Sequence, residues 1–175
     1  TGPTRRSAPR TRRTLSSRAV PSDGNTGQHP PADWLLRAER NRRPNHGQGN
    51  CLFLAIAGHP GCTASHQELR QAVVGYLRAH TDEFMPMWDG LMPTPNGVDI
   101  PCPSFEDYLR HMAEDGAWGG HLELVAAAHV LGAAILVCGH SVPTSLFGDR
   151  HRPMPEVERR YALWYADGHY EGIRT

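Results

Sequence analysis

The first 31 residues contain almost no large apolar side chain, and this confines any hydrophobic core to the rest of the 175-residue chain. The segment is rich in Arg, Ser, Thr, Pro and Gly. Such a composition cannot bury enough apolar surface to offset the entropy lost on ordering the backbone. We therefore expect a disordered tail over residues 1–32, followed by one folded domain over residues 33–175.

The first part of this domain has helical patterns. Two segments follow a serine that lies three residues before an acidic side chain, the pattern of a helix cap: Ser65 with Glu68, and Ser104 with Asp107. Apolar residues then recur at helical spacing, and glycines end several segments. The predicted helices cover residues 33–43, a short apolar run over 51–58, residues 66–80, residues 105–116 and residues 121–131.

The last part of the chain favours strands. Residues 133–138 are an apolar strand candidate, and residues 161–165 and 169–173 flank an Asp-Gly turn as a β-hairpin does. The Pro-rich segments 85–103 and 139–158 are expected to be loops. Helices first and strands later predict an α+β or α/β layered domain.

Composition excludes several classes of protein. The four cysteines are scattered without a CxxC pair, which fits free thiols in a reducing compartment better than a disulfide framework or a zinc site. No apolar run is long enough to cross a bilayer, and no secretory signal is visible. Residues 44–175 carry a net charge of about −7, which suits a basic protein partner and repels nucleic acid. Residues 1–43 carry about +7, and we interpret them as a solvated arm, with RNA or an acidic surface as the alternative partner.

Cys51 directly follows a glycine-rich turn, Gly47-Gln48-Gly49-Asn50, at the start of an apolar run. Unpaired backbone N–H groups at the first turn of a helix favour a thiolate and can stabilise an oxyanion. The arrangement therefore suits a nucleophilic cysteine, although a buried core cysteine fits the same pattern.

His169 and Glu171 are two residues apart on the final strand, so both side chains fall on one face. Glu171 can then orient the imidazole while the other ring nitrogen faces a thiol, the role of the third member of a catalytic triad. Asp167 is also two residues from His169, but it lies in the turn. A surface strand with outward polar residues is the plainer alternative.

These features, together with a block of residues 108–137 that contains Trp118-Gly119-Gly120, resemble the OTU (ovarian tumour) family of papain-like cysteine proteases. The resemblance spans about residues 45–175. It implies an α+β papain-like fold, with a small central β-sheet sandwiched by helices. It further implies a deubiquitinase with Cys51 as nucleophile, His169 as base, Glu171 as orienting residue and no metal or cofactor.

The resemblance also implies further site residues. The oxyanion would be held by Gln48, Gly49 and Asn50, and substrate would contact Trp118, Gly119 and Tyr170. Two positions depart from the family pattern. Gln48 stands where Asp is common, so the oxyanion loop is supported differently or the Gln amide donates to the oxyanion itself. Glu171 stands where Asn or Asp is common.

The implied function is hydrolysis of isopeptide or peptide bonds at the C-terminal glycine of ubiquitin, polyubiquitin or a ubiquitin-like modifier, by a monomer in the cytoplasm or the cytosol of a host cell. Residues 85–103 are candidate walls of a channel that admits only glycine. Three alternatives stay open: a viral polyprotein-processing protease of the same fold, a catalytically weak ubiquitin-binding module, and a thiol acyltransferase.

Overall fold

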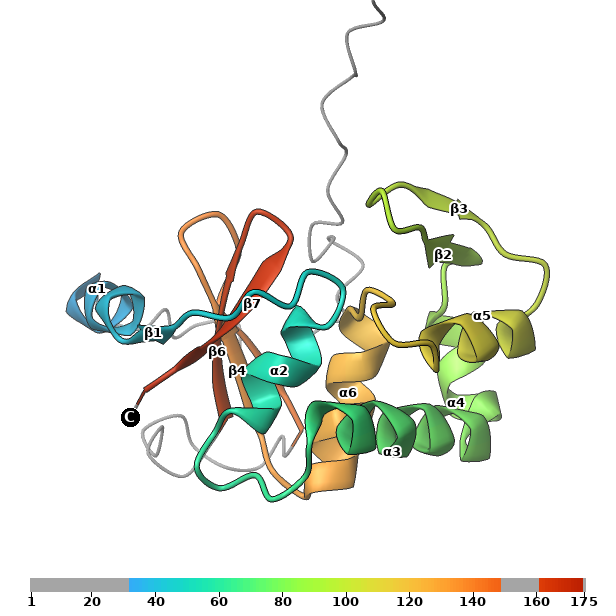
Figure 1. Ribbon diagram of the computed structural model, residues 1–175, viewed down its shortest axis with the longest axis horizontal. Helices are drawn as coiled ribbons and strands as arrows, with labels where there is room; N and C mark the ends of the chain where they lie inside the picture. The colour runs from blue at the N-terminus through green and yellow to red at the C-terminus, as the bar shows by residue number, and fades with distance from the viewer. Residues whose placement is uncertain (1–31, 149–160, 175) are drawn as a thin grey trace, which may run out of the picture.

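A computed structural model of the chain describes residues 32–148 and 161–174 (Figure 1). The predicted tail, apart from Ala32, and residues 149–158 of the predicted loop 139–158 lie outside the described residues. The helical elements are α1 (Ala32–Arg40), α2 (Cys51–Ala57), α3 (His66–Ala79), α4 (Thr81–Phe84), the 3-10 turn η1 (Met85–Met87), α5 (Phe105–Met112) and α6 (His121–Leu131). The strands are β1 (Arg42–Arg43), β2 (Leu91–Pro93), β3 (Asp99–Pro101), β4 (Ile135–Cys138), β5 (Ser145–Phe147), β6 (Tyr161–Ala166) and β7 (His169–Ile173).

The central sheet has five strands in the order β1-β7-β6-β4-β5. β4 and β6 are parallel, and the other neighbours are antiparallel. β2 and β3 form a separate antiparallel pair. The first and last strands of the main sheet along the chain, β1 and β7, are therefore neighbours.

The sheet is covered on both faces, as its side-chain alternation requires. Leu163 of β6 belongs to the larger core, which α2, α3 and α6 share. Trp164, the next residue, belongs to a smaller core with Ala38 of α1 and Ile173 of β7. Figure 1 shows α1 on one side of the sheet and the other large helices on the opposite side. The predicted α+β class, with helices on both sides of a small sheet, is confirmed.

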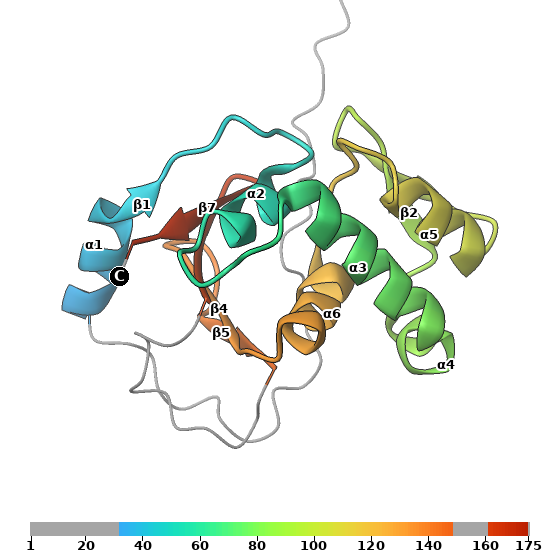
Figure 2. The ribbon, with the colours of Figure 1, turned by 60° about the horizontal axis from the view of Figure 1, so that its bottom comes forward.

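The helix α3 forms where its capping box predicts. Ser65 Oγ accepts from the backbone N–H of Glu68 at 3.1 Å, and the Glu68 carboxylate accepts from the N–H of Ser65 at 3.3 Å. Leu69, Val73 and Leu77 of its apolar stripe are buried, and the helix packs against α2, α5 and α6, the last of which lies beside it in Figure 2. Helix α3 is thus a rigid support behind the start of α2.

The predicted end of α5 at Gly116 is wrong by one turn. Ser104 Oγ accepts from the Asp107 N–H at 3.1 Å and opens the helix as expected, but the helix stops at Met112. The backbone N–H of Gly116, which has φ of +83°, instead donates to the side chain of Asn50 at 2.9 Å. A tertiary contact with the loop before α2 ends the helix earlier than the glycine does.

Three predictions missed short strands. The helix predicted over 33–43 ends at Arg40, and the last residues pair with β7 as β1. The segment 85–103 is not only loop, because it holds η1 and the β2–β3 hairpin, and the segment 139–158 holds β5. A strand of two or three residues is too short to show a periodic sequence pattern. Whether it forms depends on the strand with which it pairs.

The hairpin of β6 and β7 is confirmed. Asp167 and Gly168 have φ angles of 56° and 78°, the left-handed pair that a two-residue type I′ turn requires. The turn places His169 as the first residue of β7, opposite Ala166.

Candidate active site

Cys51 is the first residue of α2, and the loop before it is packed tightly against the rest of the molecule. A Cβ atom added to Gly49 would lie 1.6 Å from the carbonyl oxygen of Gly116, and one added to Gly47 would lie 2.0 Å from a methyl group of Leu54. Gly49 is therefore required by close approach to backbone, whereas a side chain at position 47 would only displace the end of Leu54. The close approach of Gly49 fixes the path of the chain into α2.

The sulfur of Cys51 lies at the outer edge of β7. The backbone N–H of Tyr170 donates to Cys51 Sγ at 3.4 Å, and Asn45 Nδ2 donates to the carbonyl oxygen of Tyr170 at 2.9 Å. β1 pairs only with Gly172 and Ile173, so this part of the edge is left to the loop. The loop before α2 takes the place of a strand there, and it brings Cys51 to the residue that follows His169.

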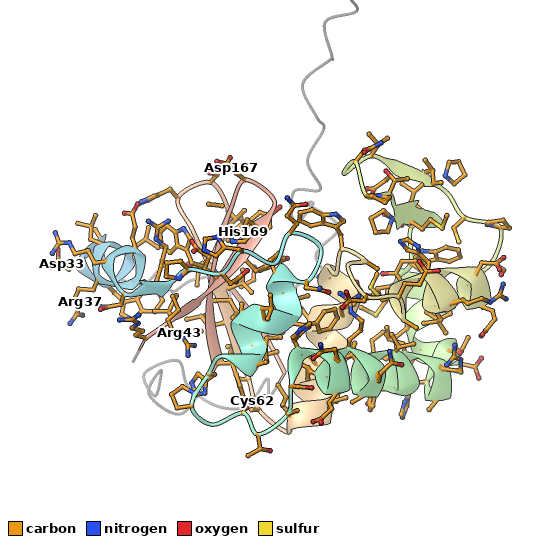
Figure 3. All side chains as sticks on the ribbon, in the orientation of Figure 1. Asp33, Arg37, Arg43, Cys62, Asp167 and His169 are labelled. Atoms are coloured by element: carbon orange, nitrogen blue, oxygen red, sulfur yellow. The ribbon has the colours of Figure 1, made fainter. Side chains whose placement is uncertain are left out.

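His169 is half-buried at the start of β7. Figure 3 shows it where the hairpin meets the loop that leads into α2. The Tyr170 backbone joins the two segments through its bonds to Cys51 and Asn45. The structure thus brings Cys51 and His169, which are 118 residues apart in the sequence, to neighbouring positions.

Glu171 lies on the same face of β7 as His169, as predicted. It is opposite Trp164 in the register, and its side chain is 15% exposed. Arg42 Nη1 lies 3.6 Å from Glu171 Oε1, and the Arg42 guanidinium lies 5.8 Å from the centre of the Trp164 ring. The carboxylate is therefore held beside a cation at one end of the strand pair.

Asp167 is exposed at the tip of the turn, and its side chain points away from β7 in Figure 3. Its φ of 56° is the conformation that the turn requires. Of the two acidic residues that flank His169, Glu171 is the one on the imidazole face of the strand. The contact of Glu171 with the imidazole stays a prediction.

Two opposing effects act on the Cys51 thiol. Burial, at 2% exposure, raises its pKa, and this effect is the larger. Backbone N–H groups of Tyr170, Leu52 and Cys51 and the positive charge of Arg70 lower the pKa. The expected influence of the helix start is present, but desolvation outweighs it in the resting structure. A nucleophilic thiolate therefore requires a base that takes the proton.

The three residues predicted to hold an oxyanion have different environments. Gln48 is exposed, and its carbonyl oxygen accepts from the backbone N–H of Cys51 at 3.2 Å. Gly49 is buried. Asn50 uses its side chain in bonds to Arg70, Gly116 and Asp115. Their role in holding an oxyanion stays a prediction.

The three predicted substrate residues also differ. Trp118 and Gly119 are half-buried, and Trp118 packs against the larger core. A Cβ on Gly119 would lie 2.8 Å from Leu52 on α2. Tyr170 is 4% exposed and its ring packs against Tyr165, so Tyr170 meets Cys51 through its backbone. Substrate contact by these residues stays a prediction.

Two residues at the site were not predicted. Asn45 bonds to Tyr170, and Arg70 of α3 bonds to the loop before Cys51. Arg70 had a signal in the sequence, because it lies three residues before Val73 and seven before Leu77 on the apolar face of the helix. A cation on that face indicates a buried polar partner.

Within the described residues, no group of three or more His, Cys, Asp or Glu side chains is arranged to hold a metal ion. Over the same residues, no helix is long and apolar enough to cross a membrane.

Known proteins share both the motifs and the fold. The model of the family described as OTU-like cysteine protease matches residues 46–170. Human deubiquitinase OTUD6B is 28% identical over 131 residues, covering 71% of this chain and 43% of that protein. Human OTU domain-containing protein 1 is 30% identical over 149 residues, covering 81% of this chain and 28% of that protein.

Solved structures agree with these matches. The OTU domain of OTUD1 superposes with a TM-score of 0.60 and 25% identity, covering 82% of this chain and 91% of that chain. An OTU deubiquitinase from Wolbachia pipientis bound to ubiquitin has a TM-score of 0.57 at 12% identity, over 76% of this chain and 94% of that chain.

The chain belongs to the family of OTU-like cysteine proteases, because the family model covers most of it and includes both Cys51 and His169. It spans less than half the length of the curated relatives described above.

Proposed function

We propose that this chain is a deubiquitinase that hydrolyses the bond between the C-terminal glycine of ubiquitin, or of a ubiquitin-like modifier, and an amine. The observation that carries the proposal is the position of Cys51 at the start of α2, with its sulfur bonded to the backbone N–H next to His169. Its family relatives include proteins named deubiquitinases.

In the first half of the reaction, His169 takes the proton of the Cys51 thiol as the sulfur attacks the glycine carbonyl carbon. A C–S bond forms and the carbonyl electrons move to oxygen. Backbone N–H groups of residues 48–51 stabilise that oxyanion once substrate displaces their resting contacts. When the intermediate collapses, the C–N bond breaks and His169 returns the proton to the leaving amine.

In the second half, His169 takes a proton from water, and the resulting oxygen nucleophile attacks the thioester carbon. The C–S bond breaks, His169 returns its proton to the Cys51 sulfur, and the glycine leaves as a carboxylic acid that loses its proton to solvent. Glu171 holds the imidazole orientation in both halves from its position on the same face of β7.

Charge supports ubiquitin as the partner. Residues 44–175 carry about −7, and the tail of ubiquitin, Leu-Arg-Gly-Gly, is basic. Neighbours of the same fold were solved bound to ubiquitin, including the Wolbachia enzyme and the Hazara virus OTU domain. Complementary charge steers encounter and favours this partner over nucleic acid.

The domain and the location of the protein belong to the same proposal. We assign catalysis to residues 33–175 and place the protein in the cytoplasm. Its four cysteines are all free thiols, and three of them are buried. A nucleophilic thiol works in a reducing compartment.

The test uses ubiquitin that carries a thiol-reactive electrophile at its C-terminus. The wild type is expected to gain the mass of one ubiquitin, and Cys51→Ala is expected to gain nothing. Cys62→Ala is the matched control because Cys62 is a half-buried thiol outside the site, and it is expected to react like the wild type.

A folded wild-type protein that forms no adduct with ubiquitin or with related modifiers would contradict the proposal. An adduct that persists in Cys51→Ala would assign the nucleophile to another thiol.

A further inference from the structure

Arg70 is a buried cation beneath the candidate active site. It lies on α3 and is only 2% exposed. An arginine is rarely buried to this degree unless its guanidinium is paired or hydrogen-bonded, because removing the charge from water is costly. The groups that bond to the guanidinium therefore indicate the role of this buried charge.

The guanidinium reaches the loop that leads into α2. Arg70 Nη2 donates to Asn50 Oδ1 at 2.7 Å and lies 3.4 Å from the carbonyl oxygen of Gly49. Nη1 donates to the carbonyl oxygen of Met112 at 3.0 Å. The guanidinium carbon also lies 4.4 Å from the centre of the Phe53 ring. Two of these partners directly precede Cys51, and Phe53 follows it on α2.

Asn50 connects the same loop to a second one. Its Oδ1 accepts from both Arg70 and the backbone N–H of Gly116, at 2.7 and 2.9 Å. Its Nδ2 donates to Asp115 Oδ1 at 3.2 Å. All these bonds fit a single orientation of the Asn50 amide. The Asn50 side chain therefore connects the loop before Cys51 to residues 115–116.

We propose that Arg70 is a positioning residue for the thiol reaction: through Asn50 and Gly49 it fixes the backbone before Cys51, and it holds a positive charge beneath the thiol. The proposal deepens the proposed function, and its substrate part rests on that function. It also accounts for how the loop is held with an exposed Gln48 at its centre.

Electrostatics agree with the geometry. The Arg70 charge is among the causes that lower the Cys51 pKa against the larger effect of burial. In turn, burial lowers the pKa of Arg70, while Asp115, Glu123 and Cys51 raise it. The charge of Arg70 and the pKa of the Cys51 thiol therefore influence each other without a direct hydrogen bond.

The main variant is Arg70→Met, which keeps a side chain of similar length without charge or donors. Replacing a buried charge by an apolar side chain of similar volume is often tolerated by the fold. Arg78→Met is the matched control, because Arg78 is on the same helix and half exposed, bonded only at the surface to Glu106. Both variants are made in a Cys62→Ser background, so that labelling of Cys51 is measured without the half-buried thiol of Cys62.

The first readout needs no ubiquitin: the pH dependence of Cys51 alkylation by iodoacetamide, followed by mass spectrometry. Arg70→Met is expected to move the midpoint of this profile to higher pH, and Arg78→Met is expected to leave it unchanged. Arg70→Lys keeps the charge without the planar fork, so we expect it to restore most of the midpoint.

The second readout is cleavage of a ubiquitin substrate. Arg70→Met is expected to lower kcat by about 100-fold with little change in KM, since a small displacement of the nucleophile has an effect of this order. Arg70→Lys is expected to stay well below the wild type because it cannot hold Asn50 and Gly49 together.

A second variant protects the test against misfolding. Asn50→Ala removes the side-chain bonds of Asn50 to Arg70, Asp115 and Gly116, while Arg70 keeps its bond to Met112. We expect kcat to fall while the alkylation midpoint stays near that of the wild type, because the charge remains.

If Arg70→Met folds and matches Arg78→Met in both the alkylation profile and kcat, the inference is overturned; if Arg70→Met does not fold, an unchanged kcat in Asn50→Ala overturns it. These outcomes are separate from failure of the proposed function. If the wild type does not react with ubiquitin but Arg70→Met still shifts the alkylation midpoint, the proposed substrate is wrong. The inference that Arg70 positions the thiol then still holds.

Discussion

Glu171 lies on the same face of β7 as His169, and its carboxylate forms an ion pair with the guanidinium of Arg42. The ion pair with Arg42 is half exposed on the arginine side, so its own contribution to stability is small, less than about 1 kcal/mol. If Glu171 orients His169 as we propose, this pair with Arg42 limits the positions that the carboxylate can take.

Glu171→Gln tests this orientation. We expect kcat for a ubiquitin substrate to fall by about 100-fold with the free energy of unfolding almost unchanged, because an amide holds the imidazole less well than a carboxylate does. Steady-state kinetics and urea denaturation of the same preparations measure the two quantities.

Glu106→Gln is the control, since Glu106 is an exposed acid paired at the surface with Arg78. A kcat for Glu171→Gln that matches this control would remove Glu171 from the triad and direct attention to Asp167.

At the scale of elements, the loop over residues 45–50 leads to Cys51 along the edge of β7 that β1 leaves unpaired. Asn45 of this loop donates to the carbonyl oxygen of Tyr170, and Cys51, which directly follows the loop, accepts from the backbone N–H of Tyr170. The loop is also in backbone contact with Gly116 through Gly49. Its shape is therefore set by packing on two sides.

Gly49→Ala disturbs this packing directly. The added Cβ would overlap the Gly116 carbonyl, which lies on backbone and cannot move like a flexible side chain. We expect the free energy of unfolding to fall by about 1–3 kcal/mol, as for other overpacked sites. The rate of adduct formation with the ubiquitin probe is expected to fall by more than 10-fold.

Ser65→Ala provides the comparison, because it removes the cap of α3 without changing the loop before Cys51 and is expected to lower stability by about 1 kcal/mol. If both variants lose activity in proportion to stability, the loop has no special role and the effect of Gly49→Ala is only destabilisation.

The sequence predicted the elements that carry their own signals. The capped helices α3 and α5 and the Asp-Gly hairpin were all recognisable from local residues. The strands β1, β2, β3 and β5 were not, because each is two or three residues long and exists through its partner. The predicted catalytic residues Cys51, His169 and Glu171 were proposed from motif and spacing, and the structure places Cys51 Sγ against the backbone N–H that follows His169.

The contacts between distant segments could not be predicted. Nothing local to Asn45 indicates its bond to Tyr170, 125 residues later. The burial of Cys51, which raises its pKa, is likewise a property of the assembled core and not of the glycine-rich turn before it. Arg70 alone among the missed residues had a usable signal, as a cation on an apolar helical face.

At the scale of the whole molecule, two cores stabilise the sheet that carries the site. The smaller one contains Trp164, which is 2% exposed and lies opposite Glu171 across β6 and β7. Arg42 also lies against the Trp164 ring. This indole therefore connects the packing of α1 to the residues beside His169.

Trp164→Ala is expected to lower the free energy of unfolding by about 3–5 kcal/mol, the usual range for truncating a buried tryptophan. Chemical denaturation followed by circular dichroism measures this change. Trp34→Ala, on α1 at the half-buried margin of the same core, is the control and is expected to lose less. Equal losses would mean that the smaller core does not depend on its buried indole.

The bond between Tyr170 and Cys51 joins positions 119 residues apart, and β7 follows every other described element along the chain. During translation, the N-terminal portion including Cys51 emerges from the ribosome long before residues 161–174 do. A nascent polypeptide therefore displays a thiol with no imidazole beside it until synthesis has passed β7. The proposed pair of Cys51 and His169 can therefore form only after synthesis has passed β7.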